Sequence, residues 1–269
     1  HLADMTRSEL GTIITAGMGT IASTTLGLYV ILLQNDIPNI AGHLVSASFI
    51  SAPACIVMAK LVMPETETPL TLGVDVKPHY ERDENLIMSI INGAYEGLKL
   101  LGGIFTLLIA FLGILALLNL GLGWAGGLLN GLFGWHVGWS LEAFLGYLFY
   151  PLTLVLGIPP SDALAIAKVI GERTVTTEVV SYNHLAALIS SGALRDPRSA
   201  IIASYALCGF AHVASLAIFV GGTGALAPAR FRDLSRLGFR ALLAATLACL
   251  MTGAVAGTFY TGSSLLFGR

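Results

Sequence analysis

The stretch VIGERTVTTEVVSYNHLA, residues 169–186, places charged and hydroxyl side chains between two apolar flanks. Its polar centre contains Glu172, Arg173 and Glu178, with several threonines between the last two. A transmembrane helix needs about 20 predominantly apolar residues, and neither flank is that long. The stretch therefore predicts a re-entrant hairpin, in which two half-length helices are joined by a polar tip that carries Glu178.

Local signals predict where these two helices begin and end. Pro159 and Pro160, followed by Ser161, begin the first helix, because proline is favoured in the first helical turn. Gly171 is expected to end it, and residues 179–189 form the second helix. Irregular backbone at membrane depth survives only where protein buries it or where it lines a watery cavity. The tip is therefore expected at such a place.

The composition indicates a membrane protein. Of the 269 residues, 55% are hydrophobic and 11% are charged, and the mean hydropathy is +0.79. A soluble domain carries about 25% charged residues, so the surface of this chain is expected to face lipid. The net charge of −2 argues against nucleic acid as a partner. Cys55, Cys208 and Cys249 lie far apart in apolar runs and are read as small hydrophobic residues rather than disulfide or zinc ligands.

Five segments are apolar and long enough to cross a bilayer, which predicts an all-α polytopic membrane protein. Residues 84–98 and 141–156 are expected to form interfacial helices, and the glycine-rich residues 121–134 an external loop. The arginines near residue 235 are expected in a cytoplasmic loop, by the positive-inside rule. The five segments are residues 11–33, 43–63, 100–120, 199–220 and 241–259, and the arginines are Arg230, Arg232, Arg236 and Arg240.

Two of these spans contain polar interruptions. GMGTIASTTLG, residues 17–27, would expose carbonyl oxygens to a cation such as Na⁺ if the helix unwinds there. Close helix packing through small residues is the alternative. ALCGFAHVASLAIFVGG, residues 206–222, gathers Phe210, His212 and Ser215 in mid-span. This pattern indicates either a cavity or a histidine that hydrogen-bonds a neighbouring helix.

Glu178 has two interpretations. A charged residue at the centre of a membrane helix costs about 3 kcal/mol on insertion scales and is by default a functional hypothesis. With the neighbouring threonines, Glu178 is predicted to bind a molecule that carries hydroxyl groups. In the alternative, Glu178 pairs with Arg173 and only holds the hairpin together.

Six segments, in order, resemble the concentrative nucleoside transporter family. They are MTRSEL, TIASTTLGLYV, SASFISAPACIVMAKLVMPETE, GERTVTTEVVSY, YALCGFAHVASLAI and GGTGALAPARFRDLSRLGFRALLAATLACLMTGAVAG. The resemblance implies inverted repeats, each with one re-entrant hairpin and one unwound transmembrane helix. It also implies a homotrimer in the bacterial inner (plasma) membrane that imports nucleosides by cation-coupled symport and alternating access.

The resemblance covers the C-terminal two-thirds of the proteins in this family. The family's first hairpin, with its Gln-Thr-Glu tip, and its early scaffold helices are not matched, so we expect the chain to be part of a longer transporter. The implied division is residues 1–63 for the first unwound helix and the following span. Residues 64–160 supply a cytoplasmic loop, interfacial helices and a scaffold span. Residues 161–222 form the second hairpin and second unwound helix, and residues 223–269 a basic linker and the last span.

The resemblance also implies roles for individual residues. Glu178 and Ser215 would hydrogen-bond the ribose, and Phe210 would cover an apolar face of the ligand. Thr20 and Ile21 would offer oxygen ligands to Na⁺ as the coupling ion. Three further contact positions depart from the family pattern: Thr177 and His212 each replace an Asn, and Thr25 replaces an apolar residue.

These departures leave two functions open. The chain is expected to carry nucleosides with an altered preference, or to be a transporter or sensor for another small polar heterocyclic or polyhydroxylated solute. Thr20 favours Na⁺ as the coupling ion, whereas His212 and Glu178 could host H⁺. The sequence contains no His-Glu metal motif and no serine in a glycine-rich elbow, so we predict neither an enzyme nor a cofactor beyond the coupling ion.

Overall fold

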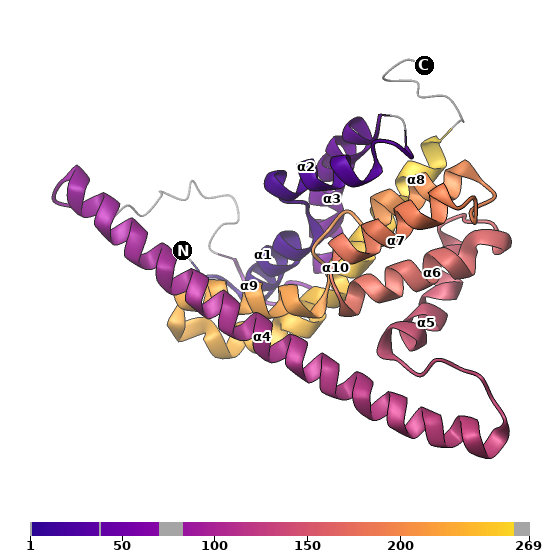
Figure 1. Ribbon diagram of the computed structural model, residues 1–269. Helices are drawn as coiled ribbons and strands as arrows, with labels where there is room; N and C mark the ends of the chain where they lie inside the picture. Colours follow the sequence, from indigo (N-terminus) through magenta and orange to yellow (C-terminus); the bar gives the residue numbers. More distant parts are fainter. Residues whose placement is uncertain (1, 38, 70–82, 261–269) are drawn as a thin grey trace.

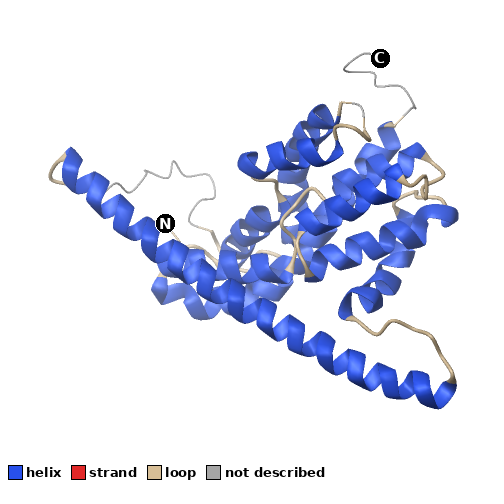
Figure 2. Ribbon diagram, viewed as in Figure 1, coloured by secondary structure: helices blue, strands red, loops and turns tan. Residues whose placement is uncertain are grey.

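The computed structural model describes residues 2–37, 39–69 and 83–260. Within these ranges every regular element is a helix and no strand occurs (Figure 2). The helices in chain order are α1 (Arg7–Gly19), α2 (Ser23–Leu33), α3 (Ile40–Val62), α4 (Leu86–Phe133), α5 (Leu141–Val155), α6 (Pro160–Val175), α7 (Glu178–Ser190), α8 (Pro197–Ala206), α9 (Val213–Leu226), the short 3-10 helix η1 (Pro228–Arg230) and α10 (Phe231–Phe259).

Four helical segments of the described chain have the length and apolar composition of membrane spans: Arg7–Leu33, Ile40–Val62, Leu86–Phe133 and Pro228–Phe259. The first comprises α1 and α2 together. The remaining predicted span, residues 199–220, is divided between the two shorter helices α8 and α9. The fold class predicted from the sequence, an all-α polytopic membrane protein, is confirmed.

Both polar interruptions are breaks in a helix, which is the arrangement that the family resemblance implies. The first break covers residues 20–22, and the backbone is extended at Thr20 and Ala22. The second covers residues 207–212 and ends with His212, which is also extended. The two breaks lie against each other, because a Cβ added to Gly209 would be 2.9 Å from the carbonyl oxygen of Gly19. The fold therefore brings the two polar interruptions to one place.

The predicted pair of short helices is also present, as α6 and α7, joined by Thr176 and Thr177. The predicted end of the first helix at Gly171 is wrong, since α6 continues to Val175. Gly171 instead allows α6 to pack closely on α5, because a Cβ there would lie 2.5 Å from the backbone nitrogen of Gly146. A glycine inside a helix costs about 1 kcal/mol, and close packing offsets that cost.

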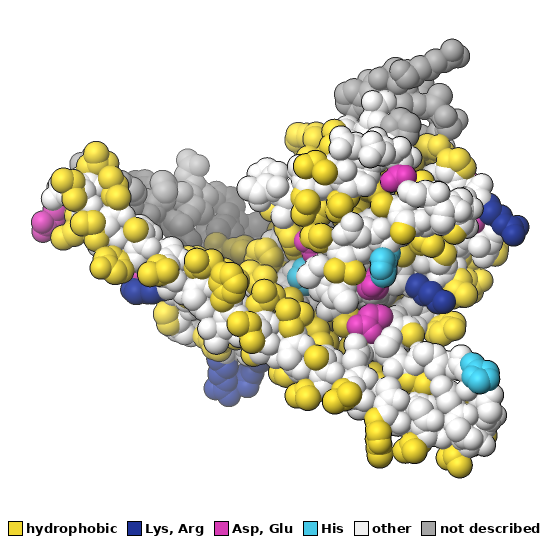
Figure 3. All heavy atoms as spheres, in the orientation of Figure 1, with side chains coloured by type: hydrophobic (Ala, Val, Ile, Leu, Met, Phe, Trp, Pro, Cys, Tyr) yellow, Lys and Arg dark blue, Asp and Glu magenta, His cyan; other side chains and the backbone are white. Residues whose placement is uncertain are grey.

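The longest helix corrects the prediction for residues 84–134. The interfacial helix at 84–98, the span at 100–120 and the external loop at 121–134 are one helix, α4, of 48 residues. The apolar residues between the glycines keep the sequence compatible with a helix, which ends only at Gly134, where φ is 68°. In Figure 1 α4 runs along one side of the other helices, and Figure 3 shows hydrophobic side chains along its length. Most of α4 is exposed, as expected for a surface that contacts lipid or protein.

The basic segment also differs from its prediction. Arg232, Arg236 and Arg240 lie in the first turns of α10 rather than in a loop, and Arg230 ends η1. Arg230 forms an ion pair with Asp233, at 3.2 Å. The apolar residues that alternate with these arginines give the segment helical periodicity, so that it extends the last span instead of preceding it.

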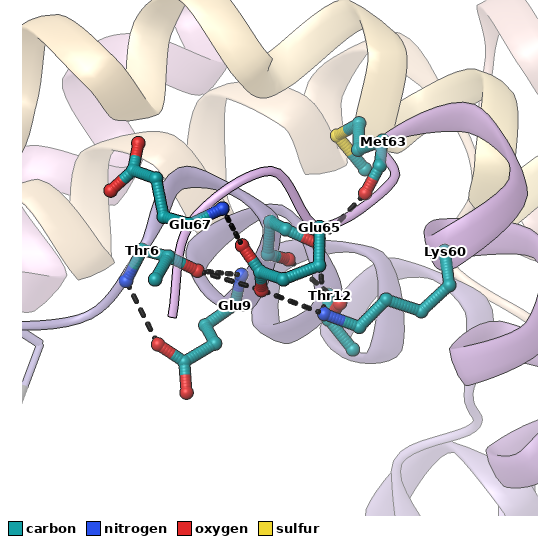
Figure 4. Close-up of polar contacts among 8 residues, drawn as sticks. Thr6, Glu9, Thr12, Lys60, Met63, Glu65 and Glu67 are labelled. Atoms are coloured by element: carbon teal, nitrogen blue, oxygen red, sulfur yellow. Dashed lines mark hydrogen bonds and ion pairs between the residues drawn. The ribbon is translucent and has the colours of Figure 1, made fainter. Parts of the chain in front are cut away.

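A polar cluster ties the start of α1 to the end of α3 (Figure 4). Thr6 caps α1 in a capping box with Glu9, and its hydroxyl donates to Glu65 at 2.9 Å. Lys60 lies 3.3 Å from the same carboxylate oxygen of Glu65. Ser8 donates to the carbonyl of Met63 at 2.7 Å. These contacts fix one end of the first broken helix against its neighbour.

Candidate functional site

Glu178 lies where the hairpin tip meets both broken helices. It is the first residue of α7, and 4% of its surface is exposed. The hydroxyl of Tyr29, on α2, donates a hydrogen bond to Glu178 Oε1 at 2.7 Å. Nε2 of His212, at the start of α9, lies 2.9 Å from Glu178 Oε2. Each broken helix therefore contributes one contact to the carboxylate.

The hydrogen bonds of His212 assign its tautomer. Nδ1 accepts a hydrogen bond from the backbone N–H of Ser215 at 3.2 Å, which makes His212 the N-cap of α9. A ring nitrogen that accepts carries no proton, so the proton of the neutral ring is on Nε2. Nε2 lies 2.7 Å from Ser215 Oγ as well as close to Glu178. His212 is thus a neutral imidazole whose single N–H, on Nε2, lies close to both residues but is in hydrogen-bonding geometry with Ser215 Oγ alone.

Two buried side-chain oxygens of α7 have no hydrogen-bond partner within the described chain. Glu178 Oε2 is near His212 but receives no aligned hydrogen bond, and Ser181 Oγ, one turn further along α7, is fully buried and unpaired. Buried polar groups are almost always hydrogen-bonded, and an unpaired one costs about 1–3 kcal/mol. A molecule that brings hydroxyl donors to Glu178 would satisfy the missing hydrogen bonds. Glu178 is therefore a candidate for binding such a molecule.

Arg173 does not pair with Glu178, so the alternative interpretation of the hairpin is wrong. Its side chain is fully buried, and Nη1 donates to the carbonyl oxygen of Ala206 at 2.8 Å. Arg173 lies in the last turn of α6, and Ala206 is the last residue of α8. The C-terminal ends of helices carry partial negative charge, which stabilises a cation there. Arg173 therefore joins two helix ends and leaves Glu178 free for another partner.

The predicted cation ligands Thr20 and Ile21 lie in the first break. Thr20 Oγ1 donates its proton to the carbonyl of Ala16 at 2.7 Å, and its lone pairs stay free to accept a cation. Hydroxyl and carbonyl oxygens at an unwound helix are the ligands that membrane transporters offer to Na⁺. Thr20 therefore supplies one oxygen of the kind that a Na⁺ site needs.

The other predicted binding residues fall into two groups. Ser215 contacts His212 directly and is buried. Thr177, Phe210 and Thr25 are half-buried on the adjoining elements, and no hydrogen bond to Glu178 joins them within the described residues. Thr177 occupies the N-cap position of α7 without capping it, and Thr25 Oγ1 donates to Ala22 at 2.9 Å.

Sequence reasoning did not find Tyr29. Its side chain is 1% exposed and its ring stacks on Tyr182 of α7, with 4.4 Å between ring centroids. The hydroxyl of Tyr182 donates to the carbonyl of Ser204 at 2.7 Å. A tyrosine within an apolar span needs a hydrogen-bond partner for its hydroxyl. The presence of Tyr29 in such a span could therefore have indicated a buried polar partner.

An open groove of about 920 Å³ lies between α5, α6 and α7 but does not reach Glu178. Glu172 and His184, whose Oε2 and Nδ1 atoms lie 2.7 Å apart in a hydrogen bond, are among its lining residues. Glu178, His212 and Ser215 are each at most 4% exposed. These three side chains are therefore not accessible from the groove.

The sequence matches a family model described as "Na⁺ dependent nucleoside transporter C-terminus" over residues 43–257. Solute carrier family 28 member 3 of Mus musculus is 38% identical over 270 residues, which cover 96% of this chain and 37% of the relative. An uncharacterized transporter of Bacillus subtilis, YutK, is 40% identical over 261 residues, covering 96% of this chain and 61% of YutK. The chain thus spans less than two thirds of the length of these relatives.

Solved structures of CNTnw share the fold. A variant of CNTnw in an outward-facing state superposes with a TM-score of 0.81 and 34% identity, covering 96% of this chain and 59% of CNTnw. CNTnw in an inward-facing substrate-bound state gives 0.71 and 33% identity, covering 98% of this chain and 60% of CNTnw. The same arrangement of helices is therefore present in a protein whose structures include both outward-facing and inward-facing states.

Proposed function

The chain belongs to the Na⁺ dependent nucleoside transporter family, and we propose that it is the part of a symporter that binds and imports nucleosides. The observation that carries the proposal is the buried carboxylate of Glu178, which has an unpartnered oxygen at the meeting point of the hairpin and the two helix breaks. A carboxylate can accept hydrogen bonds from two vicinal hydroxyls, and charge-assisted hydrogen bonds are short and strong. A ribose supplies such a pair.

We propose that the other contact residues surround the nucleoside held by Glu178. Ser215 donates to the sugar, since its hydroxyl proton is not needed by His212, and His212 orients both side chains. Phe210 covers an apolar face of the base. Thr177 and Thr25 add hydroxyls on adjoining elements.

The proposed coupling ion is Na⁺, bound at Thr20 and Ile21. The support is the family itself, together with the free lone pairs of Thr20 in the first break. H⁺ is the second candidate, because Glu178 and His212 form a buried acid–base pair. The capping bond from Ser215 to His212 Nδ1 favours the neutral ring, and so supports Na⁺.

Transport is proposed to proceed by alternating access. Glu178 is 4% exposed, so in this scheme a nucleoside reaches it when elements around it separate. The moving unit would comprise the hairpin and the two broken helices, in residues 1–63 and 161–222, and α4 would belong to the stationary scaffold. The outward-facing and inward-facing states of CNTnw support this scheme.

Location and assembly are also proposed from the family. The relatives matched are transporters, which supports a carrier rather than an enzyme. We place the protein in a bacterial plasma (inner) membrane as a homotrimer, with α4 supplying apolar surface for lipid and neighbouring protomers. A carrier or sensor for another small polyhydroxylated or polar heterocyclic solute is the alternative, since Thr25 and His212 add polarity to the site.

Uptake into proteoliposomes tests the proposal. The complete natural protein is reconstituted, and accumulation of radiolabelled uridine and adenosine is measured with an inward Na⁺ gradient, an inward H⁺ gradient, or neither. Accumulation above equilibrium with Na⁺ supports the Na⁺ symporter, and accumulation with H⁺ alone supports the second ion. If nucleosides only equilibrate under every gradient, the symport proposal is wrong.

A further inference from the structure

Tyr29 donates a hydrogen bond to the candidate carboxylate of Glu178. Its hydroxyl lies 2.7 Å from Glu178 Oε1 and donates to it, although 149 positions separate the two residues in sequence. Both side chains are buried, at 1% and 4% exposure. A hydrogen bond to a charged group in a buried site is stronger than one between neutral groups. This bond therefore fixes both the direction of the carboxylate and which of its oxygens remains available.

The ring of Tyr29 is itself held in place. It stacks on Tyr182 with 24° between the ring planes, a ring contact that does not involve the Tyr182 hydroxyl, which donates to the carbonyl of Ser204. Tyr29 lies on α2, directly after the first break, and Glu178 and Tyr182 both lie on α7, directly after the hairpin tip. The stacked rings thus join α2, the second half of the first broken helix, to α7, the second helix of the hairpin.

We propose that Tyr29 is a positioning residue for the substrate: it occupies Oε1 of Glu178 and thereby directs Oε2 toward the sugar hydroxyls. The proposal rests on the nucleoside-binding role of Glu178 given above. Oε1 already accepts a hydrogen bond from Tyr29. The oxygen of Glu178 that can accept hydrogen bonds from a substrate is therefore Oε2, which has no aligned partner. Without the tyrosine hydroxyl the carboxylate can turn, and a bound diol loses a fixed acceptor.

Two matched variants test this. Tyr29→Phe and Tyr182→Phe each remove one hydroxyl from the same stacked pair, and each keeps the ring. Only the first hydroxyl touches Glu178. In proteoliposomes with the complete protein, KM and maximal rate are measured for a ribonucleoside and for its 2′,3′-dideoxy analogue.

Tyr29→Phe is expected to raise the KM for the ribonucleoside about tenfold, with the maximal rate and the KM for the dideoxy analogue changed less than twofold. Tyr182→Phe is expected to leave all of these within twofold. A merely structural role for Tyr29 would raise KM for both substrates alike, and that result, or an unchanged KM for the ribonucleoside, would overturn the proposal.

Glu178→Gln distinguishes this inference from the proposed function. If Glu178→Gln impairs uptake while Tyr29→Phe does not, only the positioning role is wrong. If Glu178→Gln transports like the wild type, the nucleoside-binding role of Glu178 is wrong. The positioning role of Tyr29, which depends on it, is then wrong as well.

Discussion

Gly209 lies so close to the backbone of Gly19 that a methyl group on Gly209 would be 2.9 Å from the carbonyl oxygen and 3.0 Å from the carbonyl carbon of Gly19. The same methyl group would be 2.6 Å from Sγ of Cys249. Gly19 ends α1 and Gly209 lies between α8 and α9, so the contact joins the two helix breaks. The candidate cation ligands and the candidate substrate ligands are neighbours because these two glycines allow it.

Gly209→Ala is expected to destabilise the protein and to reduce transport. Overpacking costs about 1–3 kcal/mol, and the atoms of Gly19 are backbone, which cannot move without displacing the first break. The measurement is thermal stability in detergent together with Na⁺-driven uptake. Gly27→Ala on α2 is the control, because no atom lies within 4 Å of the added methyl group. Equal stability of the two variants would show that the contact is unimportant.

His212→Asn is expected to keep transport, with KM within about threefold, and His212→Ala to raise KM at least tenfold. Asparagine can cap α9 through its oxygen and still donate toward Glu178, whereas loss of an N-cap costs about 1 kcal/mol and removes the donor. The check is uptake kinetics between pH 6 and pH 8. Because His212 is a neutral donor, the asparagine variant should keep the wild-type pH profile. Loss of H⁺-driven uptake in this variant would contradict that account and favour a proton carrier.

Thr20→Val is expected to raise the half-saturating Na⁺ concentration about tenfold, because it removes one hydroxyl oxygen from the first break. Thr12→Val is the matched control: Thr12 donates to the carbonyl of Ser8 in the same way that Thr20 donates to Ala16, but it lies within α1, away from the break. Uptake is measured as a function of Na⁺ concentration. An equal response of the two variants would remove Thr20 from the cation site.

The carboxyl group of Glu65 is expected to make the stability of the folded protein depend on pH. Partial burial acts to raise the pKa of Glu65, but hydrogen bonds from Thr6, from the backbone of Glu67 and from Lys60 outweigh it and hold the pKa below its ordinary value. A carboxyl whose pKa is lowered by folding contributes stability above the unfolded pKa of about 4.3, and this contribution is lost as the pH falls through the lower, folded value.

Glu65→Gln should therefore lower Tm at pH 7 by a few degrees, for a loss of about 1 kcal/mol, and the difference from the wild type should shrink as the pH falls below about 4. Glu67→Gln is the control, since only the backbone of Glu67 contacts Glu65. Unfolding is followed in detergent from pH 7 to pH 3.5. A difference that stays constant over this range would contradict the assignment.

The sequence predicted features that depend on local pattern. Small and hydroxyl residues within apolar spans marked both breaks, and the two short apolar flanks around Glu178 marked the hairpin. The errors arose where glycine was read as a signal to stop a helix. Gly171 serves close packing against Gly146, and the glycines of residues 121–131 lie within α4, a helix of 48 residues.

Contacts between distant segments were not predictable from one sequence. Glu178 pairs with Tyr29 rather than with nearby Arg173 because α2 packs against α7. No local sequence pattern predicts this packing. His212 was identified as a candidate, but its neutral tautomer follows only from its position as the N-cap of α9. The residue types at the candidate site could be read from the sequence, whereas the contacts between them required the fold.

The most direct test of the central claim is the discrimination between a ribonucleoside and its 2′,3′-dideoxy analogue by wild-type protein and by Glu178→Gln. Uptake of both substrates is measured in proteoliposomes at saturating Na⁺. If Glu178 binds the sugar hydroxyls, the wild type should prefer the ribonucleoside about 100-fold in kcat/KM, and the variant should retain less than about tenfold. An unchanged preference in the variant would show that another group recognises the sugar.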